Sequence, residues 1–244
     1  MDAPIKLSER LTAIAQMVSP GKRACDVGCD HGFVSIYLVQ QGICPFALAM
    51  DVRKGPLEQA RMHIAESGLE TQIETRLSDG VRNYHKGEAQ SLILAGMGGR
   101  LMMRILSNPN AEDFEELVLS PQSEISLFRR FLQEQGWYTV AENMIYEEGK
   151  YYPVIKAVRP KKGECVAMEE GFRAESIPEE LAFRFGRLLL LQKNPVLYRF
   201  LQQEKEKLET LLVKLEETES LRGQERKTVL EEDLDYISKA ISLF

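Results

Sequence analysis

The chain has 244 residues, 44% of them hydrophobic and 28% charged, and its formal net charge is −6 at pH 7. This is the composition of a globular protein with a sizeable core. The acidic balance argues against a protein that coats nucleic acid without specificity, because such binding depends on Lys and Arg neutralising phosphates. Charged residues interrupt the first 21 positions and every apolar run stays short of about 18 residues, so we expect a cytoplasmic protein without a membrane span.

The cysteines show no paired CxxC pattern, and most lie in apolar stretches where a free thiol behaves as a small hydrophobic group. We therefore expect neither disulfides nor a metal site at Cys25, Cys29, Cys44 and Cys165.

Up to about Pro160, short apolar runs rich in β-forming residues alternate with helical patterns, which indicates repeated βα units. Helices are predicted to begin near Leu7, Gly32, Pro56, Gly99 and Ile125. Seven strands are predicted at 23–27, 46–51, 73–77, 91–95, 116–119, 139–145 and 152–159. No helix separates the last two strands, so they should form an antiparallel end. The predicted fold is α/β, with the seven-stranded, mostly parallel sheet of a class I Rossmann-like methyltransferase.

The pattern changes after residue 160. No periodicity is sustained over 161–177, where we predict a linker. The segment Ser176-Ile177-Pro178-Glu179 has the form of a capping box, so a helix should start there and run to about Lys193. Asn194-Pro195 should end it, because a residue before proline is pushed out of helical geometry.

Two apolar stripes at helical spacing follow, and together they predict an antiparallel helical hairpin of the coiled-coil kind. The hairpin either packs its stripes against each other or clamps a macromolecular substrate. We predict two domains, 1–160 and 161–244, and a monomer in which the coiled coil is the surface for any weak dimer. The stripes are Leu201, Leu208, Leu211 and Leu215, then Leu230, Leu234, Ile237 and Ile241.

The first strand runs into Asp26-Val27-Gly28-Cys29-Asp30-His31-Gly32, which is typical of a nucleotide-binding turn. Gly28 lets the backbone approach a ligand, and the next helix offers free N–H groups. A dinucleotide fingerprint would have a glycine where Asp30 stands, and this negative charge disfavours a pyrophosphate. A ligand with an ammonium and a sulfonium, S-adenosylmethionine, fits better than NAD, so a dehydrogenase is the least favoured alternative.

The next two strands also end in acids. Asp51, followed by Val52, lies about 20 residues beyond the glycine turn, where an acid commonly accepts from ribose hydroxyls. Asp79 precedes Gly80 and could accept from an adenine amino group. Carboxyl ends of parallel strands line one crevice, so these acids should meet Asp26 there.

The fourth strand ends in Ala95-Gly96-Met97-Gly98-Gly99, whose glycines allow close backbone approach beside a methyl donor. We predict a cofactor site formed by Asp26, Gly28, Cys29, Asp51, Val52, Asp79, Gly80, Ala95, Gly96 and Met97.

These residues resemble the TrmK family of bacterial tRNA methyltransferases, which act on N1 of the adenine at position 22. The matching segments are Leu7-Ser8-Glu9-Arg10-Leu11, Asp26 to His31, Gly80, Gly87-Glu88-Ala89, Ala95 to Gly99, and Gly149-Lys150 with Tyr152. One departure is Ser120-Pro121-Gln122, where the family tends to read Gln-Pro after the fifth strand. A contact that the family makes through its Gln is therefore not assigned to this chain.

The resemblance implies a tRNA partner and a flipped adenine acceptor. The polar candidates for catalysis are Asp30 and His31, and Tyr152 could stack on the adenine or pack the terminal hairpin. Phosphate contacts are assigned to Arg10, Arg100, Arg104 and Lys150. The alternatives are a methyltransferase of a small molecule or protein, and an RNA-binding module without catalysis. A basic rim around the Gly96 loop would favour RNA as the substrate.

Overall fold

The computed structural model describes residues 5–159, 177–216 and 221–244. The chain forms two compact units, Met1–Met168 and Glu169–Phe244. The predicted linker, except for Ile177, and the predicted boundary at residue 160 lie outside the described residues.

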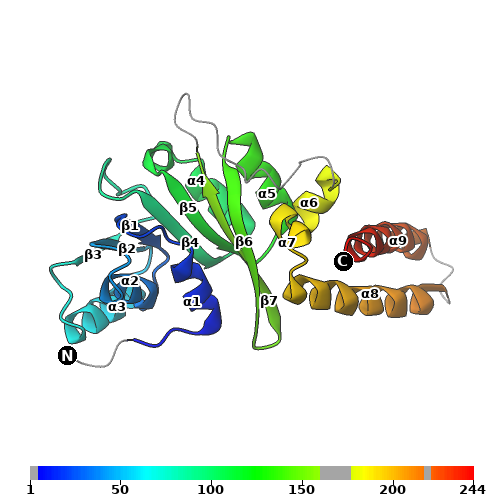
Figure 1. The fold of residues 1–244 in the computed structure, drawn as a ribbon, viewed down its shortest axis with the longest axis horizontal. Coiled ribbons are helices and arrows are strands. Elements are labelled where there is room, and N and C mark those ends of the chain that lie inside the picture. The colour runs from blue at the N-terminus through cyan, green and yellow to red at the C-terminus, as the bar shows by residue number, and fades with distance from the viewer. Residues whose placement is uncertain (1–4, 160–176, 217–220) are drawn as a thin grey trace. The chain divides into compact units, whose positions relative to one another are not determined.

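The first unit is built on a seven-stranded sheet in the order β3-β2-β1-β4-β5-β7-β6, which confirms the predicted topology (Figure 1). Strands β1 to β5 are parallel, and β7 runs antiparallel to both β5 and β6. Glu148 and Gly149 join β6 to β7 with positive φ angles of 49° and 79°, as a tight hairpin turn requires. The strands are β1 Ala24–Val27, β2 Ala47–Asp51, β3 Ile73–Leu77, β4 Ser91–Met97, β5 Glu116–Pro121, β6 Tyr138–Glu147 and β7 Lys150–Val158.

Helices cover both faces of this sheet, and the alternation of side chains along each strand supplies a core on each side. In β4, Leu92 and Leu94 pack on one face with α4 and α5, while Ile93 packs on the other with α1 and α2. Each such fully buried side chain contributes about 1.5–3 kcal/mol. The helices are α1 Glu9–Gln16, α2 Phe33–Gln40, α3 Lys54–Glu66, α4 Gly99–Leu106 and α5 Ile125–Glu134, with a 3-10 turn η1 at Pro109–Asp113.

The second unit begins with two short helices, α6 Glu179–Phe185 and α7 Arg187–Leu191, where the sequence predicted one. Gly186 breaks the predicted helix with φ 93° and ψ 117°, a conformation that only glycine adopts without strain. The break after Lys193 is confirmed. Asn194 caps the next helix, because its Oδ1 accepts from the N–H groups of Val196 and Leu197 at 3.0 Å each.

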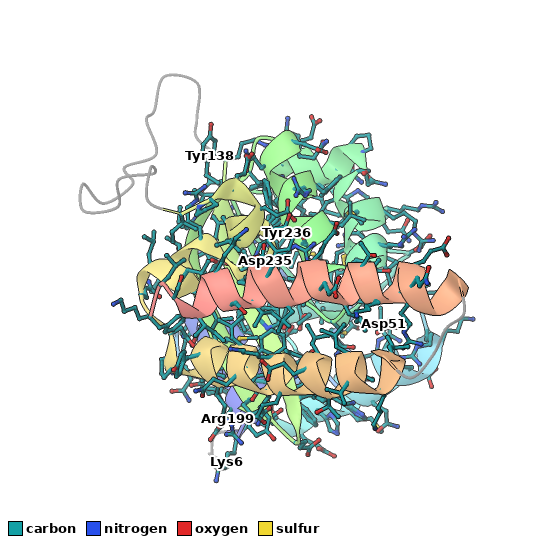
Figure 2. All side chains as sticks on the ribbon, turned by 90° about the vertical axis from the view of Figure 1, so that its right-hand side faces the viewer. Lys6, Asp51, Tyr138, Arg199, Asp235 and Tyr236 are labelled. Atoms are coloured by element: carbon teal, nitrogen blue, oxygen red, sulfur yellow. The ribbon has the colours of Figure 1, made fainter. Side chains whose placement is uncertain are left out.

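The predicted helical hairpin is confirmed by α8 Pro195–Glu216 and α9 Leu221–Ile241, which lie side by side in Figure 2. Burial is uneven along it. Leu201 and Ile237 are buried, whereas Val213 and Val229, nearer the connection between the helices, are exposed. No helix in the described ranges is long and apolar enough to cross a membrane.

Candidate functional site

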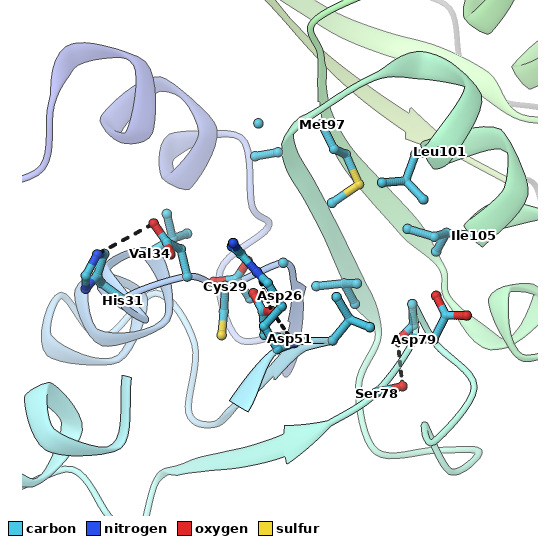
Figure 3. A pocket seen from close by; sticks show the side chains of 18 of the residues that line it. Asp26, Cys29, His31, Val34, Asp51, Ser78, Asp79, Met97, Leu101 and Ile105 are labelled. Carbon is cyan, nitrogen blue, oxygen red and sulfur yellow. Dashed lines mark hydrogen bonds and ion pairs between the residues drawn. The ribbon is translucent and has the colours of Figure 1, made fainter. Parts of the chain in front are cut away.

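A cavity of about 480 Å³ opens at the carboxyl ends of the parallel strands (Figure 3). It lies where chain order reverses in the sheet, since β1 has β2 on one side and β4 on the other. This switch point is where open α/β sheets bind ligands. The cavity is lined by all ten residues predicted for the cofactor, Asp26, Gly28, Cys29, Asp51, Val52, Asp79, Gly80, Ala95, Gly96 and Met97.

Asp26 is the most perturbed acid of the cavity. Its side chain is buried, and Oδ2 accepts a hydrogen bond from Ser35 Oγ at 3.0 Å. Burial raises the pKa of Asp26 from 3.8 to about 6, because removing a carboxylate from water disfavours its charged form. Ser35 lowers the pKa and nearby Asp51 raises it further. Among the described residues, no cation lies within ion-pair distance of the Asp26 carboxylate.

The turn after β1 is held by its own backbone. The N–H groups of Gly28 and Cys29 both donate to the carbonyl oxygen of Met50, at 2.8 and 3.1 Å. They are thus occupied, and the free N–H groups expected for a ligand belong to the first turn of α2, where Phe33 and Val34 line the cavity. Gly28 has φ 77°, and a Cβ there would lie 2.9 Å from Met97 Cε, so glycine makes room for that side chain.

Asp51 is the last residue of β2, and Asp79 follows the end of β3 by two residues at the same edge of the sheet. Asp51 is buried, and its Oδ1 accepts from the N–H of Arg53 at 2.8 Å. Asp79 is half exposed and pairs with Arg82 and Arg104, at 3.3 Å each. Two acids with different surroundings therefore stand at this end of the cavity.

Gly80 fits the packing below Asp79. It has φ 61°, and a Cβ there would lie 2.9 Å from Ile105, which also lines the cavity. A glycine at this position satisfies both the turn conformation and the close approach of α4.

The Gly96 loop borders Arg10. The guanidinium of Arg10 lies over the ring of Tyr152, 4.9 Å from its centroid, and its Nε is 3.9 Å from Glu147 Oε2. Tyr152 does not line the cavity, and it reaches the site only through Arg10. Tyr152 also pairs with Ile145 across the β6–β7 hairpin, and its stacking on an acceptor stays a prediction.

Asp30 and His31 lie at the cavity wall. His31 Nε2 is 3.7 Å from Asp30 Oδ2, and the imidazole stacks on Phe33, with ring centroids 5.3 Å apart. His63 Nδ1 lies 3.0 Å from the His31 carbonyl oxygen. The ring of His31 is thus held in place by its neighbours.

The predicted RNA contacts separate into two groups. Arg10 and Arg104 line the cavity, whereas Arg100 and Lys150 do not. Arg100, 77% exposed, is the second residue of α4 and pairs with Glu124 at 3.1 Å.

Sequence reasoning missed several lining residues. Leu101 and Ile105 are inside α4, where nothing in the sequence marks them. Gln122 lines the cavity directly after β5, and its place after a strand end was the signal that could have marked it.

The first unit is similar to proteins of known function. A family model described as a methyltransferase domain matches residues 7–155. The tRNA (adenine(22)-N(1))-methyltransferase of Bacillus subtilis (strain 168) is 30% identical over 202 residues, which cover 82% of each chain.

Solved structures agree with the predicted class I fold. The crystal structure of the TrmK tRNA methyltransferase of B. subtilis is 25% identical, with a TM-score of 0.82 over 97% of this chain and 99% of that one. Streptococcus pneumoniae Sp1610 in complex with S-adenosyl-L-methionine is 29% identical, with a TM-score of 0.80 over 97% and 100% of the two chains. The class I fold is therefore confirmed.

Proposed function

The chain belongs to the tRNA (adenine(22)-N1)-methyltransferase family, and on that premise we propose that it transfers a methyl group from S-adenosylmethionine to N1 of adenine 22 in a tRNA. Family membership confirms the resemblance found in the sequence. The observation that carries the activity is the cavity at the switch point, where three strand-end acids and the Gly96 loop meet.

The residues of the cavity fit this cofactor. Buried Asp26 has no cation within ion-pair distance among the residues that the structure describes, which suits a ligand with an ammonium and a sulfonium. The N–H groups at the start of α2 suit its carboxylate. Asp51 suits the ribose hydroxyls, because no described residue contacts its Oδ2, and Asp79 beside Gly80 suits the adenine amino group. Cys29, Val52, Ala95 and Met97 supply the apolar wall.

The reaction demands little acid or base chemistry from the chain. When bound, S-adenosylmethionine supplies a methyl group on a sulfonium; the S–CH3 bond breaks as the N1–CH3 bond forms, leaving a thioether and a cationic N1-methyladenine. Adenine N1 already has a lone pair, so no proton has to leave before transfer. The chain has to align the two partners and exclude water, which together lower the barrier by several kcal/mol.

Two residues are placed to act on the developing charge. Asp30 is the most exposed of the acids that line the cavity, and a carboxylate there would stabilise the cation formed on adenine. His31 would orient Asp30 through the 3.7 Å contact. Tyr152 would act indirectly, by holding Arg10 at the Gly96 loop.

A basic rim favours RNA over a small molecule as the substrate. The chain as a whole is acidic, yet the exposed side chains of Arg53 and Arg104 line the cavity. Two further exposed arginines adjoin lining residues, Arg82 through its ion pair with Asp79 and Arg100 as the chain neighbour of Leu101. Guanidinium groups in such positions suit tRNA phosphates, and we assign further phosphate contacts to Arg10, which lines the cavity, and to Lys150 at the start of β7. The rim is the feature that separates RNA from the alternative substrates.

We assign catalysis to residues 1–160 and a grip on the tRNA body to residues 161–244, with α8 and α9 as a short coiled coil. Three exposed apolar side chains on the hairpin, Leu211, Val213 and Val229, support a surface that meets a partner. We further infer a monomer that works in the cytoplasm, where tRNA is matured.

Methyl transfer from labelled S-adenosylmethionine tests the activity. A bacterial tRNA transcript with adenine at position 22 should be labelled, and the same transcript with guanine there should not. Digestion of the product to nucleosides should then give N1-methyladenosine. If the chain binds the cofactor by calorimetry and labels neither transcript, the tRNA assignment is wrong.

A further inference from the structure

Gln122 presents a free carboxamide to the cavity. It directly follows β5, and its backbone N–H donates to the Met97 carbonyl oxygen at 3.0 Å, which fixes the residue beside the end of β4. Its side chain is exposed and lines the cavity, and it makes no hydrogen bond to any residue in the described ranges. The backbone of Gln122 is thus fixed by a hydrogen bond, whereas its carboxamide has no hydrogen-bond partner among the described residues.

A niche lies beside this carboxamide. Gly96 has φ 76°, and a Cβ at this position would lie 3.7 Å from Arg10 Nη1 and 4.0 Å from Gln122 Nε2. A Cβ there would be in ordinary van der Waals contact with both side chains, so Arg10 and Gln122 flank the space directly over Gly96. The next residue, Met97, reaches the Gly28 turn, so the niche and the cofactor loop adjoin consecutive residues of β4.

The two flanking side chains offer different chemistry. Arg10 has only donors, and its guanidinium is held by the Tyr152 ring and by Glu147. Gln122 has both a donor and an acceptor on one planar edge. Only Gln122 of these two can therefore match a base edge that carries one donor beside one acceptor.

Adenine has two such edges, N6 with N1 and N6 with N7. Pairing through N1 would occupy the lone pair that must receive the methyl group. Pairing through N7 leaves N1 free, and a Gln carboxamide forms this bidentate contact with adenine N6 and N7. We propose that Gln122 holds the acceptor adenine by N6 and N7 in the niche over Gly96; this rests on the proposed function.

This contact also explains how guanine is rejected. Guanine offers two acceptors, O6 and N7, on the same edge, so the carboxamide can satisfy only one of them and its oxygen faces O6. Gln122 is thus a specificity residue as well as a positioning residue for the reaction.

A tRNA with 7-deazaadenine at position 22 tests the contact, because it lacks the N7 acceptor and keeps N1 and N6. We expect wild-type kcat/KM to fall about tenfold on this tRNA, and Gln122→Ala to lose roughly tenfold to a hundredfold on the normal tRNA. The variant should then show no tenfold preference between the two tRNAs. Intrinsic effects of the base on N1 affect both proteins equally and cancel in this comparison.

Two further variants complete the design. Gln122→Glu keeps an acceptor for N6 and loses the donor for N7. Its kcat/KM should therefore be the same on the normal and the 7-deazaadenine tRNA, within the difference that Gln122→Ala shows. Gln135→Ala removes an exposed glutamine at the end of α5, remote from the cavity, and should behave as wild type. All variants should bind S-adenosylmethionine with wild-type affinity by calorimetry.

The outcomes separate the two proposals. If wild type methylates the normal tRNA and shows the same preference between the two tRNAs as Gln122→Ala, the Gln122 contact is overturned and the activity stands. If wild type does not methylate the normal tRNA, the proposed function fails and the contact fails with it.

Discussion

Two of the carboxylates buried in the parallel strands lie at opposite ends of those strands. Glu116, 1% exposed, is the first residue of β5 and accepts hydrogen bonds from Ser19 N, Ser19 Oγ and Ser91 Oγ at 2.6–2.9 Å. Lys22 and Lys156 lie 3.3 and 3.4 Å from it. Asp26, 5% exposed, stands near the opposite end of β1 with Ser35 as its side-chain donor and no cation within ion-pair distance among the described residues.

The pKa values of the two acids move in opposite directions. Burial raises the pKa of Glu116, but the donors of Ser19 and Ser91 and the charge of Lys156 outweigh it and hold the pKa below 4.5. Burial of Asp26 is not offset in this way, and its pKa rises to about 6. A carboxylate that serves the fold is fully paired, whereas one left unpaired in a cavity is available for a positively charged ligand.

Glu116→Ala should produce the largest change in stability. It would leave Lys22, Lys156 and the serine donors without their shared acceptor, so the free energy of unfolding should fall by about 3–5 kcal/mol in urea titrations. Glu115→Ala is the matched control, because its exposed carboxylate pairs with the same Lys22 at 3.3 Å and should cost under about 1 kcal/mol. If both variants lost the same free energy of unfolding, the buried cluster around Glu116 would not be the source of the stabilisation.

Asp26→Asn should act in the opposite direction on stability. The unfolded carboxyl ionises near 3.8 and the folded one near 6, so wild type loses stability as the pH rises from about 4 to 6 and stays lower above that. The variant avoids this loss and keeps an acceptor for Ser35. Its advantage over wild type should be absent at pH 3.5 and reach about 3 kcal/mol at most at pH 8. An advantage that does not change with pH would contradict this account.

The same variant should lose cofactor affinity. A neutral amide no longer attracts the cationic ligand, so calorimetry should show S-adenosylmethionine bound at least tenfold more weakly at pH 8, corresponding to about 1.4 kcal/mol. Wild-type affinity should itself decline below about pH 6, as Asp26 takes up a proton, and that decline should be missing in Asp26→Asn.

Arg100→Ala should have the smallest effect, because this side chain is exposed and belongs to neither buried site. Unfolding should change by less than about 0.5 kcal/mol. Binding of tRNA should weaken a few-fold, with the slope of log K against log salt reduced by about 1. Lys86→Ala, an exposed cation in the loop before β4, should leave the slope unchanged. If both variants shift it equally, the rim at the cavity is not the RNA surface.

The sequence predicted the strands and the acids at their ends because both depend on local patterns. Apolar runs between turn residues defined each strand, and Asp26, Asp51 and Asp79 each stood at or just beyond a predicted strand end. The sequence did not predict the helix break at Gly186, because an isolated glycine inside a helical pattern is often tolerated. Only the backbone angles of Gly186 show the break.

What the chain determined by itself is the order of βα units, and with it the edge of the sheet at which a ligand would bind, since parallel strands must end together. Tertiary structure alone decided which polar groups were already used. It paired the Gly28 and Cys29 N–H groups with Met50, placed Tyr152 behind Arg10, and left Gln122 free over Gly96. Each of these depends on a contact between residues distant in sequence, and local patterns carry no information about such contacts.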